Sequence, residues 1–259
     1  MNKKIIRILV SIFIFLPIFY MLVWAFIERW PFESVFPEKI SFRAWKSLLS
    51  NPLNIKILFS SLAMSLLVAF LAVFLSYPAS KALAFYDLKF KNLIRVLLFV
   101  PIILPVTSLA IGLHLNFLRL GIANKFWGVV LVHIFPCIPY CIMSLEPVFS
   151  SVGQEYENQA TLLGAKGIKK FLYVNLPLAL PGIKTAFFMS FIVSFSQYFL
   201  TFLIGGGLVR TYATIMFPIL SNKDRHEAAV FSLVFLIVCL IVEKITFSFG
   251  KKFDVEDYA

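Results

Sequence analysis

Six long apolar runs decide what this chain can fold into. Each holds about 20 mostly apolar residues, the length of helix that crosses the ~30 Å hydrocarbon core of a bilayer. The runs lie at about 5–27, 57–80, 93–115, 127–149, 183–204 and 229–249. Hydrophobic residues make up 60% of the 259 residues and charged residues only 14%, against roughly 45–50% and ~25% in soluble domains. The sequence therefore predicts an all-α integral membrane protein in which residues 1–259 form a single transmembrane domain.

Basic residues set the expected orientation of the chain. They occur close together beside the ends of the apolar runs, at Lys3 and Lys4, Lys89 and Lys91, Lys169 and Lys170, and Lys251 and Lys252. Cytoplasmic loops of membrane proteins carry an excess of Lys and Arg, so we expect a multi-pass cell-membrane (inner or cytoplasmic membrane) protein with both termini cytoplasmic. The same distribution accounts for the formal net charge of +11. Membrane lipid, and not nucleic acid, is the expected partner of these charges.

The motifs of enzymes and metal sites are absent from the sequence. It contains neither the G-x-x-x-x-G-K-[ST] loop that binds nucleotide phosphates nor a G-x-S-x-G nucleophile elbow. A fragment of a zinc-protease motif begins at His226 but has Val230 where the second histidine is required. Cys137, Cys141 and Cys239 lie inside apolar runs, where we expect packing residues and no disulfide framework. We therefore predict no catalytic residue, no metal site and no cofactor bound by this chain.

Ionisable residues inside the apolar runs are functional candidates by default. His114 and His133 lie near predicted span ends, where water reaches them, and either could be a ligand, a proton carrier or a structural residue. None of the 13 acidic residues is central to a run, and Glu146 and Glu243 lie near the proposed inner ends. A proton-coupled carrier needs a carboxylate near mid-membrane, so this placement argues against that class.

Prolines interrupt two of the apolar runs. Pro101 and Pro105 lie in the run 93–115, and Pro136 and Pro139 lie in the run 127–149. Because proline lacks the amide hydrogen and kinks helices, we expect bends at these places. A hinged gate and a static bend both fit the pattern.

The longest polar stretch on the predicted inner side, residues 150–182, has an ordered pattern. Residues 157–163 contain neither Gly nor Pro, and Gly164 follows them directly. Pro177 and the Pro181-Gly182 pair mark later helix boundaries. The pattern predicts a short helix, a break at Gly164 and a second short helix.

This stretch resembles the EAA loop of ATP-binding-cassette (ABC) importer permeases. The family pattern reads E-A-A, three residues, G, nine residues and I-x-L-P. Ala160 matches the second alanine, Gly164 falls at the glycine, and after nine residues Val174-Asn175-Leu176-Pro177 takes the place of I-x-L-P. The departures are Asn158 and Gln159 at the glutamate and the first alanine, with Glu157 one residue early.

The resemblance implies a six-transmembrane-helix type I importer permease bundle that forms half of a translocation pathway. It implies as partners two copies of a cytoplasmic ABC ATPase, a second permease subunit and an extracytoplasmic solute-binding protein, with ATP and Mg bound by the ATPase. The residues implied in coupling to the ATPase are Glu157, Asn158, Gln159, Ala160, Gly164, Ala165, Lys169, Val174, Leu176 and Pro177. The competing interpretation is an amphipathic helix on the inner leaflet with its lysines at lipid phosphates.

A second segment resembles one particular group of importer permeases. Residues 194–198 (Ser-Phe-Ser-Gln-Tyr), the glycines at 205–207 and Thr211 are similar to permeases of the polyamine, thiamine, ferric-iron and sulfate group. The expected function is thus binding-protein-dependent import of a small solute. A dication would favour carboxylates along its path, so the lack of acids in the runs argues against a polyamine.

Polar residues inside the runs are the candidates for the translocation pathway, because polar groups in a membrane tend to face the bundle interior or a wet cavity. They are Thr107, Ser108, Ser194, Ser196, Gln197 and Thr201. Hydrogen bonding between helices explains Gln197 equally well. The alternative function is a secondary transporter or channel subunit not driven by ATP, and a membrane enzyme ranks third.

Overall fold

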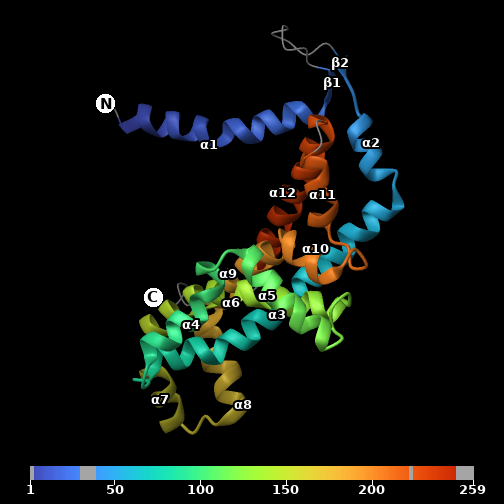
Figure 1. Cartoon of the computed structure of the whole chain (residues 1–259). Coiled ribbons are helices and arrows are strands. Elements are labelled where there is room, and N and C mark those ends of the chain that lie inside the picture. Colours follow the sequence, from blue (N-terminus) through green and yellow to red (C-terminus); the bar gives the residue numbers. More distant parts are fainter. Residues whose placement is uncertain (1–2, 30–38, 222–223, 249–259) are drawn as a thin grey trace. The chain divides into compact units, whose positions relative to one another are not determined.

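A computed structural model of the chain describes residues 3–29, 39–221 and 224–248. Within these ranges the regular structure is helical apart from two short strands, β1 (Ile27–Arg29) and β2 (Lys39–Ile40). The predicted basic pair at 251 and 252 lies outside the described residues. The helices are α1 (Lys3–Ala25), α2 (Arg43–Leu49), α3 (Pro52–Phe85), α4 (Lys91–Ile103), α5 (Val106–Arg119), α6 (Phe126–Val152), α7 (Glu155–Leu162), α8 (Gly167–Lys170), the π-helix η1 (Phe171–Asn175), α9 (Leu176–Phe195), α10 (Phe199–Gly205), α11 (Tyr212–Ser221) and α12 (Arg225–Ser248) (Figure 1).

Several helices are long and apolar enough to cross a membrane. Among the described residues there are four such segments, and the pair α4 and α5 makes a fifth if the two helices together form one bent span. The four are Pro52–Phe85, Phe126–Val152, Gly167–Phe195 and Arg225–Ser248. The first predicted span forms α1, whose apolar part, Leu9–Ala25, is shorter than these. The all-α membrane fold is therefore confirmed, and the count of six spans stays a prediction.

The predicted third span, 93–115, is two helices in the structure. The axes of α4 and α5 differ by 100° across a short break. Leu104 has an extended backbone with ψ 141°, and Pro105 follows it as the residue before α5. The proline ring disfavours helical geometry in the residue before it, so the helix stops at Ile103 and restarts in a new direction.

The predicted fifth span, 183–204, also divides. Helix α9 follows η1 directly at Leu176, with Pro177 in its first turn, where proline is tolerated, and it continues through Pro181, where the sequence predicts a helix boundary. It ends at Phe195, and α10 starts at Phe199 after a break at residues 196–198. Gly206, in the left-handed conformation with φ +53°, ends α10, as glycine commonly does at helix ends.

The sequence predicts one domain, and the structure groups the chain in two compact units. Unit 1 consists of Met1–Phe59 with Tyr212–Leu240, and unit 2 consists of Ser60–Thr211 with Ile241–Ala259. The candidate coupling and pathway residues all belong to unit 2.

Unit 1 joins the beginning of the chain to the segment Tyr212–Leu240. Strands β1 and β2 pair in antiparallel fashion, with Ile27 opposite Ile40. An ion pair of 2.8 Å joins Arg43 of α2 to Asp224, just before α12. His226 lies with its Nδ1 atom 3.3 Å from a backbone carbonyl oxygen and with its ring 5.2 Å from that of Trp24. The residue at which the zinc-protease fragment begins thus packs against α1.

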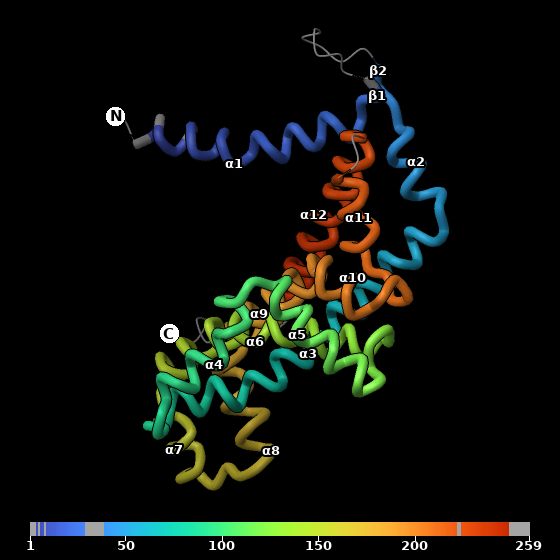
Figure 2. Tube along the Cα trace, in the orientation of Figure 1, coloured from blue at the N-terminus to red at the C-terminus, as the bar shows by residue number. Residues whose placement is uncertain are grey.

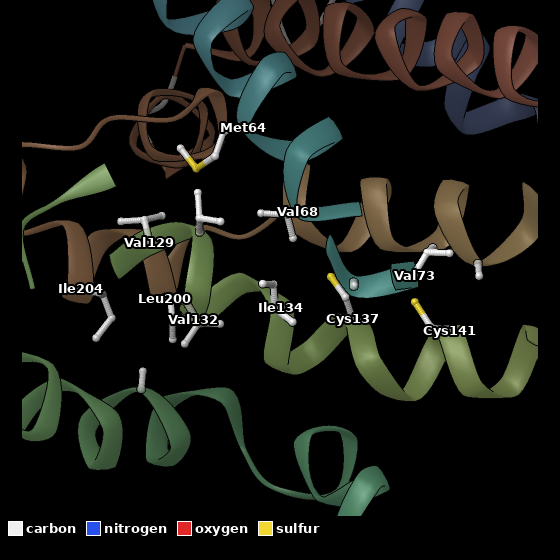
Figure 3. Packing of buried hydrophobic residues seen from close by; sticks show 14 of the residues in the cluster. Met64, Val68, Val73, Val129, Val132, Ile134, Cys137, Cys141, Leu200 and Ile204 are labelled. Carbon is white, nitrogen blue, oxygen red and sulfur yellow. The ribbon is translucent and has the colours of Figure 1, made fainter. Parts of the chain in front are cut away.

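Unit 2 has a core built around α6 and α9. The two helices approach so closely at Gly182 that an added Cβ atom would lie 3.0 Å from the Ser144 carbonyl oxygen. Cys137 and Cys141 are buried free thiols on α6, on the side that faces Val73 of α3 (Figure 3). They pack in the apolar core, as the sequence predicts.

Candidate functional site

The segment that resembles the EAA loop forms a compact protrusion, the α7–α8 loop (residues 155–175). Helices α7 and α8 extend together from the end of unit 2 (Figure 1), and Figure 2 shows the turn that joins them. Gly164 makes that turn with φ +86°, where its amide donates to the Thr161 carbonyl oxygen and the Ala165 amide donates to that of Ala160. This is the hydrogen-bonding pattern of a glycine helix end. The helix, break and second helix occur where the sequence predicts them.

The turn exposes two leucines at its tip. Leu162 and Leu163 are 87% and 88% exposed. Asn158 and Gln159 of α7 are also exposed, whereas Ala160 is buried against the rest of unit 2. The loop also exposes Tyr156, Ile168, Leu172 and Tyr173, and a protrusion that exposes several large apolar side chains is a candidate interaction surface.

Glu157 points into unit 2, away from this tip. One carboxylate oxygen lies 2.5 Å from Lys81 Nζ of α3, and the other lies 3.9 Å from Lys170 Nζ of α8. Lys81 is a functional candidate that the sequence analysis missed, because nothing in the local pattern of α3 indicates which side chain the loop contacts. The chain offers only one indirect signal, which is a lysine directly after the predicted apolar run 57–80.

The second half of the loop leads into the long helix α9. Lys169 is exposed, while Val174, Leu176 and Pro177 are half-buried where η1 joins α9. Proline removes an amide donor from the ladder, and the wider π-type turn at Phe171–Asn175 immediately precedes Pro177. The I-x-L-P part of the motif therefore shapes the junction of the loop with a long apolar helix.

Two of the predicted pathway residues are brought together by a histidine. The His133 ring, only 1% exposed, lies with Nδ1 3.0 Å from Ser194 Oγ and with Nε2 2.8 Å from Thr201 Oγ1. Thr201 donates in turn to the Gln197 carbonyl oxygen at 2.8 Å, and the Ser194 and Ser65 hydroxyls lie 3.3 Å apart. The expectation that water reaches His133 is wrong.

The remaining pathway candidates lie elsewhere in unit 2. Thr107 and Ser108 are exposed in the first turn of α5, directly after the bend. Ser196 is exposed at the break that follows α9 and donates to the Val193 carbonyl oxygen at 3.2 Å. The Gln197 side chain is half-buried. Of the six predicted residues, Ser194 and Thr201 thus belong to the buried network. Thr107, Ser108 and Ser196 are exposed next to helix breaks.

These features define a class of protein: a multi-pass, all-α membrane permease with a protruding helical loop. The chain belongs to the family described as binding-protein-dependent transport system inner membrane components, whose pattern matches residues 70–250. It is an ABC importer permease. Permeases of this family work with ATPase subunits, a second permease subunit and a solute-binding protein.

Individual relatives agree with this assignment. The chain is 28% identical to the molybdate/tungstate transport system permease protein WtpB of Pyrococcus abyssi, over 62% of this chain and 64% of that protein, which is less than two thirds of its length. It is 27% identical to the molybdenum transport system permease protein ModB of Mycobacterium tuberculosis, over 77% and 81%. It is 22% identical to the spermidine/putrescine transport system permease protein PotC of Haemophilus influenzae, over 77% and 78%. These relatives are named as transport permeases and not as enzymes.

A solved structure has a similar fold. It is described as a bacterial ABC transporter involved in the import of the acidic polysaccharide alginate. The similarity has a TM-score of 0.65 at 16% identity, and it covers 95% of this chain and 94% of that one. It supports the fold assignment.

Proposed function

We propose that this chain forms half of the translocation pathway of an ATP-driven importer and couples to a separate ATPase through the α7–α8 loop. The observation that carries the proposal is the tip formed by Leu162 and Leu163, two leucines held almost fully exposed by the Gly164 turn. A protruding apolar tip fits a cleft on a partner protein, where burial of each leucine contributes about 1.5–3 kcal/mol. The partner ATPase, in two copies, binds ATP and Mg, and this chain binds no cofactor.

The mechanism we infer is alternating access. Closure of the ATPase dimer moves the α7–α8 loop, and the loop moves the helices of unit 2 that carry the polar groups at the breaks. In this arrangement both termini and the loop lie on the cytoplasmic side of the cell membrane, while a solute-binding protein delivers the solute from the other side. The second permease, a different chain or a second copy, supplies the other half of the pathway.

Co-purification tests this proposal. The tagged chain is extracted from its native membrane in mild detergent, and its partners are identified by mass spectrometry. We expect a P-loop ATPase and a second permease subunit in stoichiometric amounts. Recovery of the chain without any ATPase, including after chemical cross-linking, would contradict the proposal.

We further propose a tetrahedral oxyanion as the solute. Relatives named for molybdate, tungstate or sulfate transport support this class. The hydroxyls of Thr107 and Ser108 are exposed beside the bend between α4 and α5, where they can donate hydrogen bonds to an oxyanion. Uptake of radiolabelled molybdate and sulfate by the complete transporter in vesicles tests the proposal, with spermidine as the control. Transport of spermidine alone would contradict it.

A further inference from the structure

The α7–α8 loop and α3 are joined by an ion pair that is largely shielded from solvent. The side chains of Glu157 and Lys81 are 12% and 22% exposed, and their charged atoms lie 2.5 Å apart. Exposed ion pairs contribute little to stability, but a partly buried carboxylate that loses its partner is left with an uncompensated charge. The Glu157–Lys81 contact is therefore costly to break.

Contacts within the loop make α7 and α8 move together. Lys170 Nζ of α8 lies 3.9 Å from the second oxygen of Glu157 and donates to Thr161 Oγ1 at 3.3 Å. The Thr161 hydroxyl donates to the Glu157 carbonyl oxygen at 2.7 Å. Glu157 thus links α8 on one side and α3 on the other.

Aromatic contacts also join the end of α3 to this region. The ring of Tyr77 meets that of Phe171 in η1 edge-on at 5.7 Å and that of Phe149 in α6 at 5.1 Å. Ring contacts tolerate a range of offsets. The Glu157–Lys81 pair adds a close, largely shielded charge contact that links α7 itself to α3.

The departure from the EAA pattern explains why the Glu157 side chain faces α3. The motif places its acid where this chain has the exposed Asn158. Successive residues of a helix are turned by about 100° around its axis, since there are 3.6 residues per turn. Moving the acid one residue earlier therefore turns it away from the outer face of α7 and toward α3.

We propose that the Glu157–Lys81 ion pair transmits displacement of the α7–α8 loop to helix α3. This inference rests on the proposed function, because it assumes that an ATPase moves the loop. Glu157 and Lys81 are positioning residues: they do not touch ATPase or solute, and they hold the loop and α3 together while the leucine tip makes the docking contact.

The first test compares Glu157→Gln and Lys81→Met with the wild-type chain in the complete transporter in vesicles. Both variants keep the size of the side chain and remove the charge. We expect the ATPase to co-purify in normal amounts while the stimulation of ATP hydrolysis by loaded binding protein falls about tenfold, within the range of typical allosteric couplings. Glu155→Gln is the matched control, since Glu155 is an exposed acid of the same helix, and its stimulation stays at the wild-type level.

A second test does not depend on how well the charge-removing variants fold. Lys81 and Glu157 are both replaced by cysteine, and one preparation is assayed before and after bridging with a short bis-methanethiosulfonate. The three native cysteines are buried, so the introduced pair is the target of the reagent. We expect stimulation to be low before bridging and to recover after it, because the covalent link replaces the ion pair.

The outcomes separate the two proposals. Normal stimulation of Glu157→Gln, or bridging that inhibits the double-cysteine protein, would overturn the transmission role while the ATPase still co-purifies. Absence of an ATPase from the wild-type complex would instead overturn the proposed function.

Discussion

At the scale of single residues, the informative side chains are polar groups whose partners lie far away in the sequence. His133 contacts Ser194 and Thr201, which are 61 and 68 positions distant, and Glu157 contacts Lys81. Polar side chains inside a membrane protein tend to pair with one another, but a linear pattern does not name the partner. These contacts became visible only when the helices were placed side by side.

Replacement of His133 by alanine tests the buried network. The change leaves a cavity among α3, α6, α9 and α10 and removes one hydrogen bond each from Ser194 and Thr201. We expect a loss of about 2 kcal/mol in the free energy of unfolding, mostly from the cavity, because hydrogen bonds between membrane helices average only ~0.6 kcal/mol. Unfolding in detergent measures this change. Ser196→Ala is the control, since that hydroxyl is exposed, and an equal loss in both variants would contradict the structural role of the network.

Replacement of Leu163 tests the docking tip. Leu163→Glu introduces a charge where an apolar contact is proposed, and we expect the ATPase to be lost on co-purification, because hot-spot residues of interfaces contribute about 2 kcal/mol or more. Leu163→Met keeps volume and polarity, so it retains the ATPase. Since Leu163 is 88% exposed, neither change affects the fold of the isolated chain. Full retention of the ATPase by Leu163→Glu would exclude this residue from the contact.

At the scale of helices, the same proline pattern has two different outcomes. The sequence predicts bends at Pro101 and Pro105 and at Pro136 and Pro139. Helix α4 has no buried residue and stops before Pro105, whereas α6 continues through its prolines. Thirteen buried residues of α6, between Gly128 and Phe149, pack it against its neighbours. Tertiary packing thus compensates in α6 for the hydrogen bonds that proline removes.

The different outcomes at the prolines of α4 and α6 indicate how much of the fold the sequence predicts. Apolar length and charge give the all-α membrane fold, and the spacing around Gly164 gives the helix, break and helix of the loop. The proline pattern predicts the bend at Pro105 but not its 100° angle, and the break after Phe195, where no proline stands, was not predicted, because both depend on which helix faces pack. For the same reason the inward direction of Glu157 could not be predicted, since one residue of register turns a side chain by about 100°.

The contact between α6 and α9 leads to a prediction at this scale. A Cβ atom at Gly182 would lie 3.0 Å from the Ser144 carbonyl oxygen and 3.1 Å from a Val148 methyl group. We expect Gly182→Val to cost about 1–3 kcal/mol, because overpacking separates the two helices. Thermal unfolding in detergent measures the effect.

Gly112 of α5 is the matched control for that change. A Cβ atom there meets nothing within 4 Å, and alanine is the better helix former by about 1 kcal/mol. Gly112→Ala should therefore leave the chain as stable as the wild type or make it more stable. A loss of stability in Gly112→Ala that matches the loss in Gly182→Val would show that close approach of α9 to α6 is not the cause.

At the scale of the whole molecule, an ABC importer permease and a secondary transporter differ in the energy source that drives transport. In the proposed function, the importer takes its energy from ATP bound by a separate subunit. The secondary transporter, which was the alternative on sequence grounds, takes its energy from an ion gradient. The positions of the acidic residues in the helices distinguish transport driven by ATP from transport driven by an ion gradient.

Acids in the long apolar helices of the described chain lie toward the helix ends. Glu146 forms an ion pair with Arg95, Glu227 accepts a hydrogen bond from Ser47, and Glu243 is near the end of α12. Gradient-driven carriers use carboxylates near mid-membrane that bind and release protons. We therefore expect uptake by the reconstituted transporter to fall at least about tenfold with vanadate, an inhibitor of the ATPase step, and to be unchanged when ionophores collapse the proton and sodium gradients. Vesicles without enclosed ATP provide the baseline. Uptake that survives vanadate and stops with the ionophores would reverse the assignment of the energy source, and the α7–α8 loop would then need a role other than coupling to an ATPase.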